Sequence, residues 1–578
     1  MKVSENKVAF FDGLYRNALE KHGNLFAKLE AAYQQYRDGG DGEGHRPYET
    51  VRNVTYELVE SQVSVNIPSP SVDSASLSEV KVKNARRITT LLASLRDRLP
   101  FEKMNELEER YTYIYGGSLF LVEWDDSLSR FGEVGGIRVT PIDPMQFVPQ
   151  PDIHEIGDME YCFLVFDTTE DELARRYHLT EGDLSRLERR DDDGAVTTVV
   201  AFYKNERGEV SRFIWSGEVM LSHLDDYYAR KERVCKVCGK SERYCLCETP
   251  ELTLVSREAE LLSEDIATDD GRVIPKGSAI PYYRPHGFPL VLRRNTPTEE
   301  GYLGLSDCLV ISHQQREINK VLSRVHEKLM MAGIYPYKPD DCQFRFDNSV
   351  GGKVLNLRPG EDPRQFGVLD TTPDISRDLD YLSRIYDDAK RILGISDAYV
   401  GGESFAAESG KAKEIRVAQA EGRLASKRVL KNAAYAELDR MIFEFYLAYA
   451  DEPRRLVRRD RYGGVEADAF CRYDFLVYDE ALQGYRYDDD YLFSVDLNGG
   501  VEYQREALWQ RNLENLKAGT LGSPDSPITL LRYWQCQERA HYPHARENVE
   551  YFTLALEEEK RKEAPYEHPE GIEAVGLY

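Results

Sequence analysis

The sequence lacks the segments that would place a protein in a membrane or in a secretory pathway. No stretch of its 578 residues approaches the ~20 apolar residues of a membrane-spanning helix. The most apolar long segment, Met441 to Ala450, is short and contains Glu444. The residues from Met1 to Asn6 show no apolar run of the kind found in signal peptides. We therefore expect a cytosol-like compartment.

Cysteine is scarce, and five of the nine cysteines stand singly along the chain. Such scattering predicts isolated thiols and not a disulfide framework. These five residues are Cys162, Cys308, Cys342, Cys471 and Cys536.

The basic surplus of proteins that grip nucleic acid is also missing. Lys and Arg total 75 against 101 Asp and Glu, which gives a formal net charge of −26. Tight duplex binding is therefore disfavoured, although an acidic wall would let DNA pass without a binding minimum. Solubility alone is the simpler explanation of this charge.

Motifs of common enzymes are absent as well. We find no H-E-x-x-H and no G-x-S-x-G. Ser409 to Ala412 resembles the end of a phosphate-binding loop, but Phe405 replaces the first Gly and Ala412 replaces the Ser or Thr that Mg²⁺ needs. The Asp-rich runs at 191–193 and 488–490 lack the spacing of a calcium loop. The sequence therefore does not predict an enzyme.

Apolar residues make up 41 % of the chain, which allows a sizeable core, and the length suggests several sub-domains. Helical periodicity predicts one long helix over 8–36. From there to about residue 220, helical patterns alternate with strand patterns. Two further helices are predicted over 305–331 and 374–393, and a long one over 409–450. Because a compact module separates the first two, we expect them to pack antiparallel. The predicted fold class is α+β.

The strongest local signal is a cysteine cluster within the polar segment 225–275. Four thiolates within 13 residues can surround a tetrahedral Zn²⁺, and such a closed site is structural. The second pair has the less usual C-x-C spacing, and His223 could replace one ligand. Four thiols without metal are the alternative. The candidate ligands are Cys235, Cys238, Cys245 and Cys247.

Basic residues concentrate in the long helix from residue 411 to residue 431, although the chain is acidic. A basic stripe can face phosphate, or it can pair with acidic residues of a neighbouring domain or subunit. The sequence favours neither reading. The residues are Lys411, Lys413, Arg416, Arg423, Lys427, Arg428 and Lys431.

The order of elements from residue 285 to residue 450 resembles that of portal proteins of tailed double-stranded DNA bacteriophages. No single motif is specific, but the ordered set is, and it covers roughly residues 48–500. The segments that carry it are Glu60 to Pro68, Tyr115 to Trp124, Ile142-Asp143-Pro144, Pro285-His286-Gly287-Phe288-Pro289-Leu290-Val291, Leu303-Gly304-Leu305-Ser306-Asp307, Glu317-Ile318-Asn319-Lys320 and Glu408-Ser409-Gly410-Lys411-Ala412.

The resemblance implies a subunit of several parts. Residues 1–303 and 410–497 would form the wing, with 225–275 as a cysteine-rich insertion, and residues 304–331 and 374–394 would form the two stem helices. The small α/β clip would be 332–373 and the tunnel loop 395–409. The remaining parts would be a helical crown, 498–559, and a mobile tail, 560–578.

The resemblance also implies which residues face DNA and partners. In the tunnel loop and the helix after it, these are Ser396, Asp397, Tyr399, Gly401, Gly402, Glu403, Ser404, Lys411 and Lys413. On the second stem helix, which we expect to expose mixed charges to the channel, they are Arg377, Asp378, Arg384, Asp388 and Arg391. In the clip they are Lys338, Arg345, Lys353, Arg358 and Arg364.

A protein of this family would form a ring, typically of twelve copies, at one vertex of the capsid. DNA would pass through its channel during packaging and ejection, and its partners would be the terminase large subunit, head-completion proteins, the major capsid protein and a scaffold. It would be assembled in the host cytoplasm and remain in the virion. The alternatives are a zinc-dependent nucleic-acid-processing enzyme and another capsid or connector protein.

Overall fold

The computed structural model describes most of the chain between residues 6 and 556, and it divides into two compact units. Unit 1 comprises Met1–Ile67, Arg96–Pro453 and Cys471–Asp490, and unit 2 comprises Pro68–Leu95, Arg454–Phe470 and Tyr491–Tyr578. Helices and strands are both abundant, which confirms the α+β class. Within that span the description omits residues 41–49, 65, 75, 77, 131–132, 191–193, 239–246, 248–251, 269–270, 300, 333, 338–361, 363, 365–366, 371, 396–409, 460–464, 482, 497–501, 524–525, 540–541, 543–544, 546–547 and 550.

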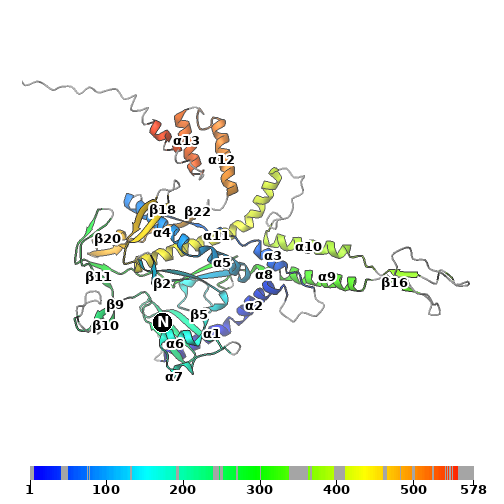
Figure 1. Cartoon of the computed structure of the whole chain (residues 1–578), viewed down its shortest axis with the longest axis horizontal. Coiled ribbons are helices and arrows are strands. Elements are labelled where there is room, and N and C mark those ends of the chain that lie inside the picture. Colours follow the sequence, from blue (N-terminus) through cyan, green and yellow to red (C-terminus); the bar gives the residue numbers. More distant parts are fainter. Residues whose placement is uncertain are drawn as a thin grey trace, which may run out of the picture. The chain divides into compact units, whose positions relative to one another are not determined.

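A five-stranded antiparallel sheet organises one part of unit 1 (Figure 1). In spatial order its strands are β4 (Phe147–Pro149), β5 (Tyr161–Thr168), β6 (Val196–Lys204), β7 (Val210–Ser216) and β8 (Val219–Leu224). Alternation puts Phe213 and Trp215 of β7 on one face with Phe163 of β5, and these rings form its core. β5, β6 and β7 confirm that strands occur before residue 220, as the sequence pattern predicts. Two short helices, α6 (Glu170–Tyr177) and α7 (Glu181–Leu184), connect β5 to β6.

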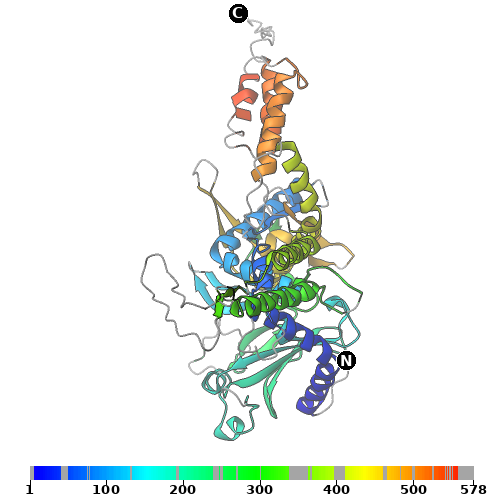
Figure 2. The same ribbon diagram turned by 90° about the vertical axis from the view of Figure 1, so that its right-hand side faces the viewer.

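The N-terminal helix predicted over 8–36 is two helices, so that prediction was wrong. α1 (Lys7–Lys21) and α2 (Gly23–Asp38) meet at His22, which leaves helical geometry at φ −91° and ψ 6°. The two helices have different partners, which the periodicity of one segment cannot reveal. Phe11 of α1 packs on the five-stranded sheet. Figure 2 shows the dark blue helix at the N-terminus beside this sheet. α2 packs instead on helices described below.

A three-stranded sheet and the helix that precedes it form the second part of unit 1. The helix is α5 (Phe101–Tyr115), and the sheet, in the order β15-β2-β3, contains β2 (Gly117–Arg130), β3 (Glu133–Ile142) and β15 (Leu290–Arg294). Gly116 ends α5 with φ +89°, and a Cβ there would lie 2.2 Å from the carbonyl oxygen of Gly304. Only glycine fits this junction between α5 and β2.

The helices predicted over 305–331 and 374–393 form an antiparallel hairpin, but the first is interrupted. It consists of α8 (Asp307–Val310) and α9 (Ser312–Met330), which meet at Ile311. The second helix is α10 (Ser376–Leu393), and the two lie side by side in Figure 1. Beyond them β16 (Ile334–Tyr337) pairs antiparallel with β17 (Gly367–Asp370). The long helix α11 (Gly410–Tyr449) follows and confirms its prediction.

Smaller elements complete unit 1. α3 (Val54–Glu60) packs near the base of the hairpin. The remaining strands form two-stranded pairs: β9 (Arg230–Cys235) with β10 (Leu252–Arg257), β11 (Ala259–Leu261) with β14 (Ala279–Pro281), β12 (Ile266–Ala267) with β13 (Val273–Ile274), and β20 (Leu476–Asp479) with β21 (Gly484–Tyr487).

Unit 2 combines two strand pairs with helices. Arg87 of α4 (Glu79–Arg98), whose last residues belong to unit 1, pairs with Asp468 at 3.2 Å. Across all described helices of both units, none is long and apolar enough to cross a membrane. The other elements of unit 2 are β1 (Ser69–Ser74), which pairs with β22 (Tyr491–Asp496), β18 (Arg454–Arg459), which pairs with β19 (Val465–Phe470), α12 (Glu502–Lys517) and α13 (Pro527–Arg539).

Candidate metal centre and the polar anchors of the helical hairpin

Three of the four predicted metal ligands come together where the β9–β10 pair opens. Cys235 is the last residue of β9 and lies opposite Leu252 in the register. The sulfurs of Cys235 and Cys247 are 3.9 Å apart, and all three, with that of Cys238, lie within 4.8 Å of one another. Cys235 is buried, Cys247 is half-buried and Cys238 is exposed. These three thiols can hold a metal ion.

The spacing of these sulfurs suits a soft tetrahedral metal. With Zn–S bonds of ~2.3 Å, tetrahedral angles place sulfurs ~3.8 Å apart, close to the distance between Cys235 and Cys247. Cys245, the fourth predicted ligand, lies outside the described residues. The suggestion that His223 replaces a ligand was wrong, because its ring lies 3.0 Å from the amine of Lys7 and 2.9 Å from the hydroxyl of Tyr203.

The opposite end of β9 is fixed to the body of unit 1. Arg230 forms an ion pair with Asp451, just after α11, and its guanidinium lies 5.5 Å from the ring centre of Tyr282 and 5.4 Å from that of Tyr449. Asp451 also lies 3.0 Å from the buried Arg472. Charge pairing and cation–π contact therefore hold the strand that carries Cys235.

The two helices of the hairpin pack through one apolar seam. Ile318, Val321 and Val325 of α9 meet Ile385 and Ala389 of α10, and all five are buried. Steps of three and four residues place these side chains on one face of each helix, as the sequence predicts. The opposite face of α10 exposes four of the predicted channel residues, Arg377, Arg384, Asp388 and Arg391.

The expectation that Asp378 is exposed on this face was wrong. It turns towards α9, where its carboxylate lies 2.5 Å from Lys328 Nζ and 2.9 Å from Arg324 Nη2. The hydrogen bond from Lys328, with the charges of both basic residues, holds the pKa of Asp378 below its ordinary value. The residue therefore links the helices near the end of the hairpin that carries β16 and β17.

At the other end of the hairpin, Asp307 anchors its base. Its carboxylate lies 2.6 Å from Lys427 Nζ of α11, and it accepts hydrogen bonds from Gln62 at 3.0 Å and Asn295 at 2.8 Å. Gln62 also accepts a hydrogen bond from Lys427 at 3.1 Å. The long helix is thus joined to the first residue of α8 through a buried charge pair.

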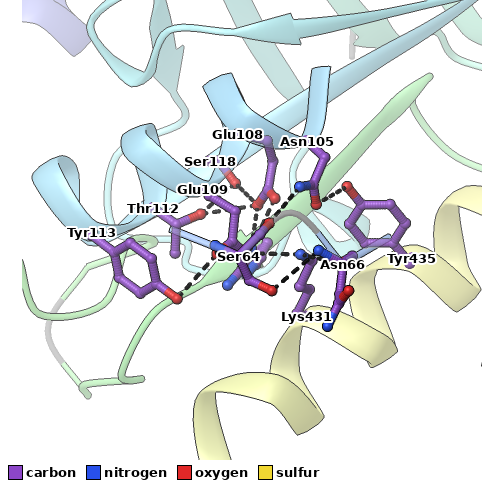
Figure 3. A network of polar contacts seen from close by, with 11 residues as sticks. Ser64, Asn66, Asn105, Glu108, Glu109, Thr112, Tyr113, Ser118, Lys431 and Tyr435 are labelled. Carbon is purple, nitrogen blue, oxygen red and sulfur yellow. Dashed lines mark hydrogen bonds and ion pairs between the residues drawn. The ribbon is translucent and has the colours of Figure 1, made fainter. Parts of the chain in front are cut away.

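A second buried network joins α5, β15 and α11 (Figure 3). Arg293 Nη1 lies 2.8 Å from a carboxylate oxygen of Glu108 and 2.5 Å from one of Glu109. Lys431 Nζ lies 3.1 Å from Glu109 Oε1 and donates to the carbonyl oxygen of Asn66 at 2.9 Å. These four charged side chains are at most 6 % exposed, so two positive and two negative charges balance inside the protein.

Further hydrogen bonds support the carboxylates of this network, as the dashed lines of Figure 3 show. Glu108 accepts from Ser118 at 2.6 Å and from Thr112 at 3.0 Å. Burial by itself would raise the pKa of Glu109, but Arg293 and Lys431 hold it below its ordinary value. The carboxylate of Glu109 therefore stays charged and paired at neutral pH.

The basic residues of α11 divide between the two readings that the sequence left open. Lys427 and Lys431 are paired inside unit 1, whereas Arg428 is exposed. For Lys411, Lys413, Arg416 and Arg423 only the helical backbone is described.

Most of the other predicted contact residues lie outside the described part of the chain. Arg364 is described and exposed. The predicted tunnel-loop and clip residues without a description are Ser396, Asp397, Tyr399, Gly401, Gly402, Glu403, Ser404, Lys338, Arg345, Lys353 and Arg358.

Sequence reasoning missed the network of Glu108, Glu109 and Arg293. One signal could have indicated it: Arg293 directly follows Leu290-Val291-Leu292, and a charge at the end of an apolar strand needs a buried partner. The identity of that partner is not visible in the sequence, because it lies some 185 residues away.

Comparisons with known proteins add no relative from which a function could be inferred. No protein-family model matches the chain, and none of the curated proteins matches it.

Proposed function

We propose that the chain is a phage portal protein that assembles as a ring at one capsid vertex. DNA would pass through the ring during packaging and ejection, and the ring would bind terminase and head-completion or tail proteins. In this proposal the protein is not an enzyme, and its place is the virion. Its order of elements, from the turn before β15 to α11, supports the resemblance noted in the sequence.

The observation that carries the proposal is the helical hairpin. α9 and α10 share one apolar seam and bear a small strand pair beyond them, and the chain then continues into a helix of 40 residues. A stem, a clip and a helix after the tunnel loop occur in this order in portal subunits. With a rise of ~1.5 Å per residue, α9 and α10 each span about 28 Å, long enough to line a channel.

The exposed face of α10 fits the passage of DNA. Arg377, Arg384 and Arg391 follow one another at seven-residue intervals, and Asp388 stands between the last two. This spacing places the three guanidinium groups on one face, ~10 Å apart along the helix. Mixed charge of this kind in an acidic protein would give weak contact with phosphate, which permits sliding.

We further propose that the cysteine cluster holds a structural zinc ion. Cys235, Cys238 and Cys247 would be ligands, and the C-x-C spacing makes Cys245 the fourth. Bound zinc would cross-link the ends of the loop between β9 and β10. With four thiolates it would have no open position for a substrate, in keeping with a role that is not catalytic.

Native mass spectrometry of the purified full-length protein tests the portal proposal. The expected result is a closed oligomer near twelve copies. A variant with Asp378→Asn and Lys328→Met, which unlinks the hairpin at its far end, should form fewer complete rings than an Arg384→Lys control. A monomer with metal-dependent nuclease activity would instead support a nucleic-acid-processing enzyme.

A further inference from the structure

Two of the three clustered thiols, those of Cys238 and Cys247, are more accessible than the thiols of Cys162 and Cys308. Cys162 and Cys308 are fully buried, and this burial raises the pKa of each thiol well above its ordinary value. Cys247, in contrast, is half-buried and has the sulfur of Cys235 at 3.9 Å. An oxidant in water therefore meets a thiol that already has a second thiol in contact.

The distance between Cys235 and Cys247 is that of two sulfurs in contact and not that of a bond. A disulfide requires ~2.0 Å, so a movement of about 2 Å would join the two atoms. β9 is held at its other end by the contacts of Arg230 with Asp451 and Tyr449. The approach can therefore come from Cys247, while the strand that carries Cys235 stays in place.

We propose that the cluster is a redox-controlled metal site, in which a peroxide-class oxidant joins Cys235 and Cys247. The inference rests on the proposed zinc site and adds its regulation. In the first step hydrogen peroxide oxidises the thiol of Cys247 to a sulfenic acid, and one water molecule leaves. The thiol of Cys235 then attacks that sulfur, the S–S bond forms and a second water molecule leaves.

The two steps balance. Without metal, two S–H bonds and the O–O bond break, one S–S bond and two O–H bonds form, and the two electrons lost by the sulfurs reduce peroxide to two molecules of water. With zinc bound, two Zn–S bonds break in place of the S–H bonds, zinc leaves, and the two protons needed for water come from the solvent. Oxidation removes two of the four proposed ligands, because a disulfide sulfur is not a thiolate. The two that remain, Cys238 and Cys245, would hold a metal ion far more weakly than four thiolates. A dithiol reductant would restore the thiols and the site.

The test uses the full-length protein loaded with zinc, whose content is measured by elemental analysis. Hydrogen peroxide is added with a chromogenic zinc chelator, and the intact mass is recorded over time. The expected result is release of one zinc per chain, in step with a loss of two hydrogen masses. Both changes should be reversed by dithiothreitol and added zinc.

Peptide mapping identifies the bridge. Trypsin cuts after Lys236 and Arg243, which separates Cys235, Cys238 and Cys247 into three peptides, and fragmentation distinguishes Cys247 from Cys245. We expect the link between Cys235 and Cys247. A bridge to Cys238 or Cys245, or oxidation to sulfinic acid without any bridge, would overturn the proposal.

Two variants separate this inference from the zinc proposal. Cys238→Ser leaves the pair intact, and its bridge should form whether or not zinc is bound, whereas Cys247→Ser should form none. If the protein binds no zinc but the bridge between Cys235 and Cys247 forms, the metal site is wrong and the thiol pair stands. If zinc binds but peroxide does not release it, the redox inference is wrong and the zinc site stands.

Discussion

Replacing Arg293 by Met should lower the stability of unit 1 by about 3–5 kcal/mol, the usual cost of breaking a buried ion pair. Arg293 is 1 % exposed, and its guanidinium contacts both Glu108 and Glu109, which are equally buried. Without it, Lys431 is the one positively charged partner that the described residues still offer the two carboxylates. One negative charge is then left without compensation in a buried site, which explains most of the expected loss.

Native-state hydrogen exchange is the suitable assay, because a chain with two compact units need not unfold in a single step. In the variant, the free energy of the opening reaction that exposes the amides of α5 and β15 to exchange should be about 3–5 kcal/mol lower. Arg384→Met, an exposed arginine of α10, is the matched control and should change the same amides by less than about 0.5 kcal/mol.

A second variant tests the cause of the loss. Combining Arg293→Met with Glu108→Gln removes one charge of each sign, so it should recover part of the lost stability. If Arg293→Met alone costs less than about 1 kcal/mol, or if the added Glu108→Gln makes the loss larger, the network does not depend on charge balance and the reasoning is refuted.

Further predictions follow from single contacts of the described residues. Gly116→Ala should destabilise unit 1 by more than about 1 kcal/mol in thermal unfolding, because φ is +89° and the new Cβ would clash with the backbone of Gly304. Gly208→Ala should cost less, because φ is +79° there but the new Cβ would meet no atom of another part of the chain within 4 Å. Asp378 has a depressed pKa, so its stabilisation of the hairpin is present above pH ~4 and lost as the pH falls through that lower pKa. Asp378→Asn should therefore weaken the loss of hairpin stability at acid pH, measured by hydrogen exchange of the α9 and α10 amides. An unchanged pH dependence in the variant would contradict this assignment. Cys235→Ser should abolish stoichiometric zinc binding in elemental analysis, whereas Cys162→Ser should leave it intact.

The sequence predicted most accurately the helices that pack through one apolar face with regular spacing. α10 was found close to its predicted bounds, because its apolar residues recur at steps of three and four. α11 was also found close to its predicted bounds, although its residues from Met441 to Ala448 are all buried. The breaks at His22 and Ile311 were missed, since each depends on what the flanking helices contact. Ser306, for example, caps α8 and also donates a hydrogen bond to the carbonyl oxygen of Ile114, almost 200 residues away.

The candidate site shows the same division between local and distant information. Cysteine spacing predicted that Cys235, Cys238 and Cys247 meet, because ligands close in sequence meet within one turn or hairpin. The spacing of charges on α10 predicted its exposed face except for Asp378. That residue turns inwards because Lys328 and Arg324 lie across the seam on α9, and no pattern within α10 reveals them.

The central claim, that α9 and α10 form the stem of a ring through which DNA passes, is tested most directly by electron cryo-microscopy of the assembled full-length protein. The reconstruction should show a closed ring of near twelve copies. Its hairpins should surround a central channel wide enough for duplex DNA, with Arg377, Arg384 and Arg391 at or near the channel wall. A compact small oligomer without a hole, or a ring whose hairpins point away from the channel, would contradict the proposed function.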